Sequence, residues 1–178
     1  MLIARELRKT NIAEYILYMW QIEDSLRACS FDIEVVEQQL VNRFQVDEMP
    51  SNEILAWYHN LAIMMEKEHV QERGHLQVFV NLVNDLNEFH LKMLKVRKDQ
   101  EYVNLCMKNR QIIGELIQKI GSANEIDACF QALYGLMMLK VKNSEISEQT
   151  KISAEQIAHQ LGHLSARYIQ FENDDFEL

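Results

Sequence analysis

The chain has 178 residues, of which 48% are hydrophobic and 25% charged, and its formal net charge is -9. This composition is normal for one soluble globular domain, and a single proline with five glycines leaves few residues that interrupt helices. The negative charge repels phosphate backbones, and no segment approaches the ~18 consecutive apolar residues of a membrane span, so neither nucleic acid nor a membrane is an expected partner.

The three cysteines indicate where the protein works. Cys29, Cys106 and Cys129 are odd in number, far apart in the sequence and surrounded by apolar residues. This pattern predicts reduced thiols in the core rather than a disulfide framework. The N-terminal sequence MLIARELRKTN contains no uninterrupted apolar segment of the kind found in a secretory signal. We therefore expect a cytoplasmic protein.

The first predicted helix covers residues 12–29. Asn11 and Glu14 form a capping box at its start, and apolar residues follow at helical spacing. Ser30 or Asp32 caps a second, shorter helix, which ends around the only proline. The apolar positions of this second helix are Ile33, Val36, Leu40 and Phe44.

Two longer helices are predicted in the middle of the chain. The first begins at Ser51, and Gly74 interrupts or ends it. The second continues to about Val96, and its apolar residues recur at helical spacing. These residues are Leu76, Phe79, Val83, Leu86 and Leu94, with His90 among them.

Three further helices are predicted toward the C-terminus. Asp99 caps the first of them, and Gly121 follows it at the position where a left-handed residue ends a helix. Asn124 starts the second, EIDACFQALYGLMMLKVK, which is apolar on more than one side and is expected at the centre of the fold. Ser147 caps the last, which precedes the acidic segment FENDDFEL.

Helical periodicity between capped starts, with no predicted strand, indicates an all-α fold. We expect a single-domain helical bundle of six or seven helices over residues 1–170. Residues 171–178 are acidic and lie at the chain end, so we expect them to form a mobile tail.

Three segments carry a resemblance to a known family. They are NIAEYILYMWQIEDSLRAC near the start, GHLQVFVNLVNDLNEFH in the middle and ALYGLMMLKVKNSEIS later in the chain. Over nearly its whole length the sequence resembles an uncharacterised domain-of-unknown-function family of Bacteroides-type bacteria. The resemblance implies a compact helical protein of about this length, and it carries no established activity, substrate or site.

Glu66-x-x-His69 and Glu72-x-x-His75 have the spacing by which helical bundles hold carboxylate-bridged metals. Such bundles take one motif from each of two helices, whereas both copies here lie on one segment. On a continuous helix, Glu66 and His75 would face opposite sides. We therefore expect a solvated helix end with no metal and no other cofactor, and the four residues stay candidate ligands only in the alternative function below.

His159-x-x-x-His163 has the spacing of two zinc ligands on one helical face. Both histidines fall opposite the apolar stripe of the last helix, and no third ligand accompanies them in the sequence. We expect both side chains to be exposed.

Glu23 and His90 are polar residues on predicted apolar faces. Glu23 lies between Met19 and Leu26, and a carboxylate is almost never buried unless it is paired. Arg27, one turn later, is the first expected partner and His90 the second. Each residue is either a structural core group or a catalytic one, and the sequence leaves both alternatives open.

Two functions from different classes remain. The first is a non-catalytic cytoplasmic helical protein that acts through protein–protein contacts as a homodimer or larger homo-oligomer. Surplus apolar faces, nine methionines and the absence of a complete catalytic set favour it. The second is a metal-dependent or small-ligand-binding helical enzyme that uses Glu23, His90 and the segment from Glu66 to His75.

Overall fold

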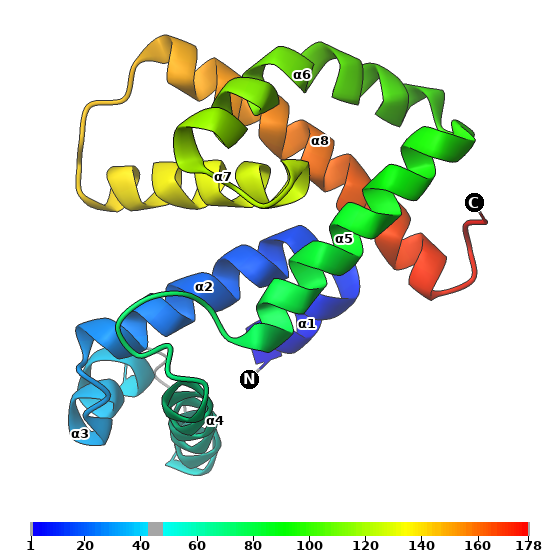
Figure 1. The fold of residues 1–178 in the computed structure, drawn as a ribbon. Helices are drawn as coiled ribbons and strands as arrows, with labels where there is room; N and C mark the ends of the chain where they lie inside the picture. The colour runs from blue at the N-terminus through cyan, green and yellow to red at the C-terminus, as the bar shows by residue number, and fades with distance from the viewer. Residues whose placement is uncertain (1, 43–47, 178) are drawn as a thin grey trace. The chain divides into compact units, whose positions relative to one another are not determined.

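The computed structural model describes residues 2–42 and 48–177, and every regular element in these ranges is a helix, which confirms the all-α class (Figure 1). The elements are α1 (Leu2–Thr10), α2 (Ile12–Ala28), α3 (Ile33–Val36), the π-helical segment η1 (Glu37–Val41), α4 (Glu48–Lys67), α5 (Gln77–Val96), α6 (Gln100–Ile120), α7 (Glu125–Val141) and α8 (Glu148–Glu172). Within the described ranges, no helix combines the length and the apolar character needed to cross a membrane.

The described residues form eight α-helices, so the expectation of six or seven was slightly too low. The additional helix is α1, whose sequence LIARELRKT buries only Ala4. Its sequence carries apolar residues at helical spacing, such as Ile3 and Leu7, but the helix has only 9 residues, so this stripe was too short to be recognised. α2 begins at Ile12, as the sequence predicts.

Helix caps were predicted well. The side chains of Asp32, Asp99, Asn124 and Ser147 each accept hydrogen bonds from backbone N–H groups in the first turn of the helix that follows. Gly121 ends α6 with φ of 75°, a left-handed conformation that glycine adopts without the steric strain of a Cβ atom. Short-range hydrogen bonding thus sets these helix ends.

The boundaries of α4 differ from the prediction. The helix begins at Glu48 rather than Ser51, and it ends at Lys67 rather than near Gly74. His69, with φ of 57°, turns the chain out of the helix before Gly74 is reached. Phe44, assigned to the preceding helix, lies outside the described residues.

The chain forms two compact units. The first unit contains residues 1–8 and 14–81, and the second contains residues 9–13 and 82–178. Helices α1, α2 and α5 each have residues in both units. A single domain over residues 1–170 stays a prediction.

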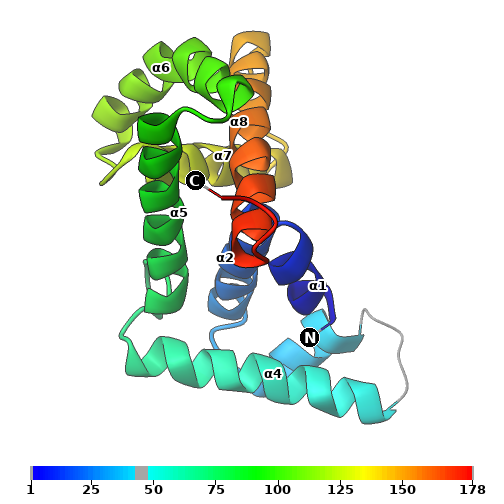
Figure 2. The same ribbon diagram turned by 90° about the vertical axis from the view of Figure 1, so that its right-hand side faces the viewer.

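In the first unit, α4 packs against α3 and η1 (Figure 2). The core residues of this unit are large and apolar, with exposed fractions of 7% or less. They include Trp20, Leu26, Tyr58, Leu61, Met65 and Leu76. Burial of such side chains stabilises a fold by about 1.5–3 kcal/mol each.

In the second unit, α6, α7 and α8 pack against one another (Figure 1). α7 was expected at the centre, and this holds only for its first half, where Ile126 and Phe130 are fully buried. In the second half, Leu139 and Val141 are exposed. The first half of α7 therefore packs in the core of the unit, whereas large apolar side chains of the second half lie at the surface.

The C-terminal segment places two aromatic rings against α5. The ring centroids of Phe171 and Phe176 lie 5.2 and 6.5 Å from that of Phe89, and the Arg167 guanidinium lies 5.2 Å from the Phe176 centroid. Apolar and cation–π contacts of this kind attach a chain end to the fold. The mobility of residues 171–178 stays a prediction.

Candidate functional site

Glu23 is 0% exposed in the first unit, which confirms its predicted burial. Its Oε1 accepts a hydrogen bond of 2.9 Å from the Leu76 N–H, and His75 Nδ1 donates to Oε2 over 2.5 Å. The Leu76 N–H lies directly before α5. It bonds to the Glu23 carboxylate instead of a backbone carbonyl of a helix. Because both oxygens are hydrogen-bonded, the buried charge is compensated.

The His75 ring connects Glu23 to an aromatic side chain. It stacks on Trp20 with a centroid distance of 4.0 Å and an interplanar angle of 9°. Its side chain is 25% exposed, whereas Trp20 is 3% exposed. α2 therefore holds the segment before α5 through one hydrogen-bonded and one stacked contact with the same imidazole.

Arg27 was expected to pair with Glu23, and this prediction was wrong. Its Nη1 donates to Asp24 over 2.6 Å, while Nε donates to the Gln71 carbonyl over 3.2 Å and Nη2 to the Val70 carbonyl over 2.8 Å. Nη2 also donates to the carbonyl of residue 74. The guanidinium goes to this loop because the loop carbonyls have no helical partners, and its fork of donors can satisfy several of them at once.

The two Glu-x-x-His motifs are separated by the end of α4. Glu66 lies in its last turn, whereas His69 and Glu72 lie in the loop, and all three are exposed. His75 alone joins Glu23. Within residues 2–42 and 48–177, no group of three or more His, Cys, Asp or Glu side chains is arranged to hold a metal ion.

We expect protein purified without a histidine tag to retain less than one equivalent of iron, manganese or zinc after dialysis. Glu66, His69 and Glu72 are exposed, and the fourth candidate, His75, already bonds to Glu23, so these four residues do not supply the three or more ligands that tight binding requires. Elemental analysis measures the bound metal. A full equivalent that disappears in a His75→Gln variant would contradict this expectation and support the enzyme alternative.

His90 is 0% exposed in the second unit, and the prediction that it could pair with Glu23 was wrong. Its Nδ1 lies 2.6 Å from the Tyr102 hydroxyl, and its Nε2 lies 3.3 Å from Glu125 Oε2. A proton on Nε2 faces the carboxylate, so in the neutral ring Nδ1 accepts the hydrogen bond from Tyr102. Glu23, in the first unit, bonds to His75 instead.

The pKa values of the groups around His90 are shifted by burial and by hydrogen bonding. Burial raises the pKa of Tyr102, which keeps the hydroxyl protonated as a donor. The hydrogen bond from His90 lowers the pKa of Glu125, which keeps the carboxylate charged. Burial also raises the pKa of Cys106 to about 11 and that of Cys129 to about 12, so neither thiol forms a thiolate nucleophile near neutral pH.

Glu125, His90 and Tyr102 form a row of polar contacts in which the two inner groups are buried. His90 and Tyr102 are 0% exposed, and only the Glu125 side chain, at 50%, reaches solvent. A substrate cannot contact the two buried groups in this conformation. The contacts therefore connect α5, α6 and α7, while a catalytic role for His90 stays untested.

His163 was expected to be exposed, and this prediction was wrong. Its side chain is 13% exposed, its Nε2 lies 2.8 Å from Asp99 Oδ2, and its ring stacks on Tyr102 with a centroid distance of 5.7 Å. Arg167 Nε donates to the same carboxylate over 2.6 Å. Sequence spacing places His163 off the apolar stripe, but Asp99 at the start of α6 supplies a charged partner there. His159 is exposed, as expected.

The Asp99 carboxylate, in the second unit, accepts hydrogen bonds from three residues. Burial alone would raise its pKa, but hydrogen bonds from His163, from the Tyr102 N–H and from Arg167 outweigh burial and lower the pKa to about 2. The residue caps α6 and holds α8 at the same time. It is charged at every physiological pH.

Residues 1–175 match the family described as "Domain of unknown function (DUF4924)". The chain belongs to this family. Membership of the DUF4924 family confirms the resemblance to an uncharacterised domain-of-unknown-function family, while the bacterial group named for it stays an expectation. No curated protein and no solved structure matches the chain.

In this DUF4924 member, the sequence reasoning missed two buried amides. Asn109 is 1% exposed and Gln160 is 0% exposed, and Asn109 Nδ2 donates to Gln160 Oε1 over 2.9 Å. A signal was present, because Asn109 falls between Cys106 and Ile113 at helical spacing on the apolar stripe of its helix. A polar residue on such a stripe needs a partner, as it does at Glu23.

Proposed function

We propose that the protein acts through protein–protein contacts as a homodimer, and that an apolar groove in the second unit of each copy receives the other copy. The groove lies between α6, α7 and α8 and has a volume of about 450 Å³. Its apolar lining includes Ile112, Leu116, Ile120, Leu136, Leu139 and Ile157. This groove is the observation that carries the proposal.

Two exposed apolar residues lie in the second half of α7, and the first of them also lines the groove. Leu139 is 43% exposed and Val141 is 71% exposed, although both are large apolar side chains. Exposed apolar residues next to an apolar groove are typical of a surface that another protein covers. Burial of both on association would remove apolar area from water, which favours the complex.

A second copy is the occupant that the rim charges favour. Glu115 and Lys119 line the groove one helical turn apart on α6. In a two-fold symmetric contact the same surface meets itself in the opposite direction, so Glu115 of each copy can face Lys119 of the other. The groove of each copy, with the exposed side chain of Leu139 in its lining, would then be covered by the other copy.

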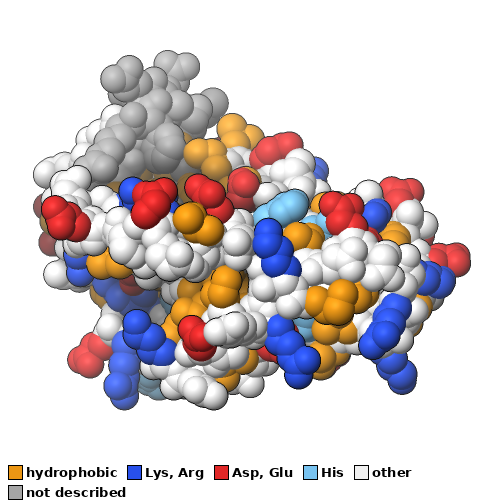
Figure 3. All heavy atoms as spheres, turned by 90° about the horizontal axis from the view of Figure 1, so that it is seen from above, with side chains coloured by type: hydrophobic (Ala, Val, Ile, Leu, Met, Phe, Trp, Pro, Cys, Tyr) orange, Lys and Arg blue, Asp and Glu red, His pale blue; other side chains and the backbone are white. Residues whose placement is uncertain are grey.

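Charged residues elsewhere on the molecule suit a limited interface. On the face drawn in Figure 3, the hydrophobic side chains of described residues lie among acidic and basic ones. A mixed surface of this kind favours one defined contact over general aggregation. The net charge of -9 acts in the same direction, since it opposes association wherever apolar contact does not outweigh repulsion.

The catalytic alternative receives less support from the geometry. Glu23 bonds to His75 and the Leu76 N–H, whereas Glu66, His69 and Glu72 are exposed, so the candidate set does not converge on one position.

The three cysteines bear on the compartment in which the protein works. Cys29, Cys106 and Cys129 are free thiols, which fits a reducing compartment, and we therefore propose that the protein is cytoplasmic.

We expect light scattering on the purified chain to give the dimer mass, and Leu139→Glu to shift the protein to monomer. Leu139 is already partly exposed, so glutamate is tolerated in the folded chain, but its charge would have to be buried in the contact between the two copies. The dissociation constant should increase by about tenfold or more.

Leu91→Glu is the matched control. Leu91 is 56% exposed on α5 and does not line the groove, so this variant should keep the dimer mass with the same change of charge. A wild-type monomer over a wide concentration range would refute the proposal. Equal weakening of the dimer by both variants would show that a different surface forms the contact.

A further inference from the structure

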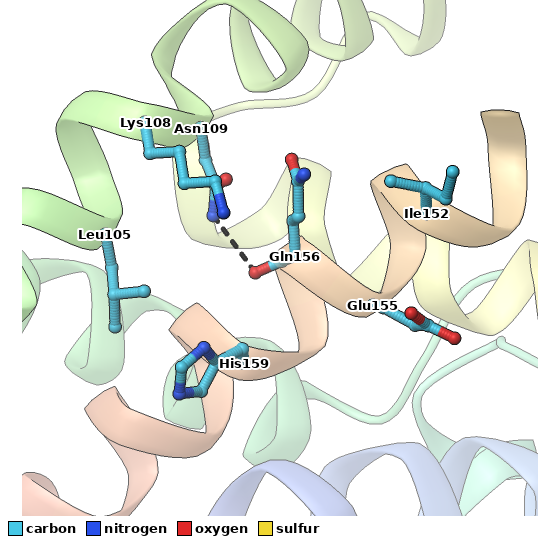
Figure 4. Close-up of a pocket in the computed structure, with 7 residues that line it drawn as sticks. All are labelled: Leu105, Lys108, Asn109, Ile152, Glu155, Gln156 and His159. Carbon is cyan, nitrogen blue, oxygen red and sulfur yellow. Dashed lines mark hydrogen bonds between the residues drawn. The ribbon is translucent and has the colours of Figure 1, made fainter.

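A pocket of about 260 Å³ lies between α6 and α8 in the second unit, apart from the groove (Figure 4). Leu105, Lys108 and Asn109 line it from α6, and α8 contributes the other side. The α8 residues are Ile152, Glu155, Gln156 and His159. Pockets for drug-sized ligands have volumes of roughly 300–1,000 Å³, so this one suits a smaller molecule.

The inner wall of the pocket contains an amide oxygen without a partner. Asn109 Nδ2 donates to the Gln156 carbonyl over 3.0 Å, drawn as the dashed line in Figure 4, and to Gln160 Oε1 over 2.9 Å. These two acceptors set the orientation of the amide, since the reverse orientation would bring oxygens together. Among the residues that the structure describes, Asn109 Oδ1 is buried and has no hydrogen-bond partner. Buried polar atoms are nearly always hydrogen-bonded, so this oxygen indicates a missing donor.

The outer part of the pocket carries charges of both signs. Lys108 and His159 are exposed donors that can bind a carboxylate, and Glu155 is an exposed carboxylate that can bind an ammonium group. Leu105 and Ile152 supply apolar surface at the same pocket. The lining therefore matches a ligand that has an anionic end, a cationic N–H donor and a small apolar part.

We propose that this pocket binds a free α-amino acid with an apolar side chain. Its carboxylate bonds to Lys108 and His159, and its ammonium group supplies the donor that Asn109 Oδ1 lacks. The ammonium group reaches this oxygen when the exposed Lys108 side chain turns outward to the carboxylate. The aliphatic side chain rests on Leu105, which lies on the same side of the pocket as Lys108 and His159 (Figure 4). The site is separate from the dimer groove and does not depend on it.

Isothermal titration calorimetry of the full chain with L-leucine tests the proposal. We expect saturable binding with one site per chain. L-Leucinamide lacks the carboxylate and N-acetyl-L-leucine lacks the charged ammonium group, so each should bind about tenfold or more weakly. A short peptide that ends in leucine retains the carboxylate but carries an amide in place of the ammonium, so it should behave like N-acetyl-L-leucine. Tighter binding of the peptide would instead assign the pocket to protein C-termini and overturn the proposal.

Two variants at exposed positions keep the fold and test the contacts. Lys108→Gln and His159→Gln should each weaken L-leucine binding by about tenfold, whereas Lys92→Gln, at an exposed lysine of α5, should leave it unchanged. Leu139→Glu, in the dimer groove, should also bind L-leucine normally, so the two proposals fail separately. No binding of leucine, methionine or phenylalanine by calorimetry and by saturation-transfer NMR would overturn the proposal, as would binding that Lys108→Gln does not change.

Discussion

Replacing Glu23 by alanine is expected to lower the free energy of unfolding by about 2–4 kcal/mol at neutral pH. The substitution removes a fully buried carboxylate that accepts hydrogen bonds from the Leu76 N–H and from His75. The Leu76 amide then stays unpaired in the core. Urea unfolding followed by tryptophan fluorescence measures the effect, because Trp20 and Trp57, the two tryptophans of the chain, both lie in the same unit as Glu23.

Glu23→Gln separates the hydrogen bond from the charge. The amide oxygen can still accept the Leu76 N–H, so we expect a smaller loss of about 1 kcal/mol. Glu53→Ala, at an exposed glutamate of α4, is the control and should change stability by about 0.5 kcal/mol or less. Glu23→Ala could instead be as stable as this control. That result would mean that, in the wild type, the free-energy cost of burying the carboxylate equals the stabilisation from its hydrogen bonds.

Local patterns in the sequence were sufficient for most of the helices. Caps such as Asp99, Asn124 and Ser147 act within one turn, so a short stretch of sequence contains both the donor and the acceptor. The same reasoning failed at Lys67, where α4 ends with no glycine or proline nearby. There the loop is held by Arg27, a residue far away in the sequence.

The partners in the candidate sites depend on tertiary contacts. Helical spacing correctly placed Glu23 and His90 on buried faces, because burial follows from the period of one helix. It did not identify His75, which lies 52 residues from Glu23, or Tyr102 as the partner of His90. A partner one turn away, such as Arg27, is visible in sequence, whereas a partner on another segment requires the packing to be known.

Asp99→Asn is expected to destabilise the protein by about 2 kcal/mol at neutral pH, and this loss should disappear in acid. The pKa of Asp99 in the folded protein is about 2, against an ordinary value of 3.8, so the folded state favours the carboxylate. Its contribution is therefore complete above about pH 4 and is lost as the pH falls through the folded value. The asparagine oxygen can still accept the Tyr102 N–H, so the variant removes the charged contacts with His163 and Arg167 and keeps the cap.

Urea unfolding followed by far-UV circular dichroism from neutral pH to pH 2 gives the stability of each variant. The difference between wild type and Asp99→Asn should shrink steadily below pH 4, because protonated Asp99 and asparagine are both neutral. Asp85→Asn, at an exposed aspartate of α5, is the control, and its small difference from wild type should not vary in this way. A loss for Asp99→Asn that stays constant down to pH 2 would mean that the hydrogen-bond geometry at the start of α6, rather than the charge, holds α8 through His163 and Arg167.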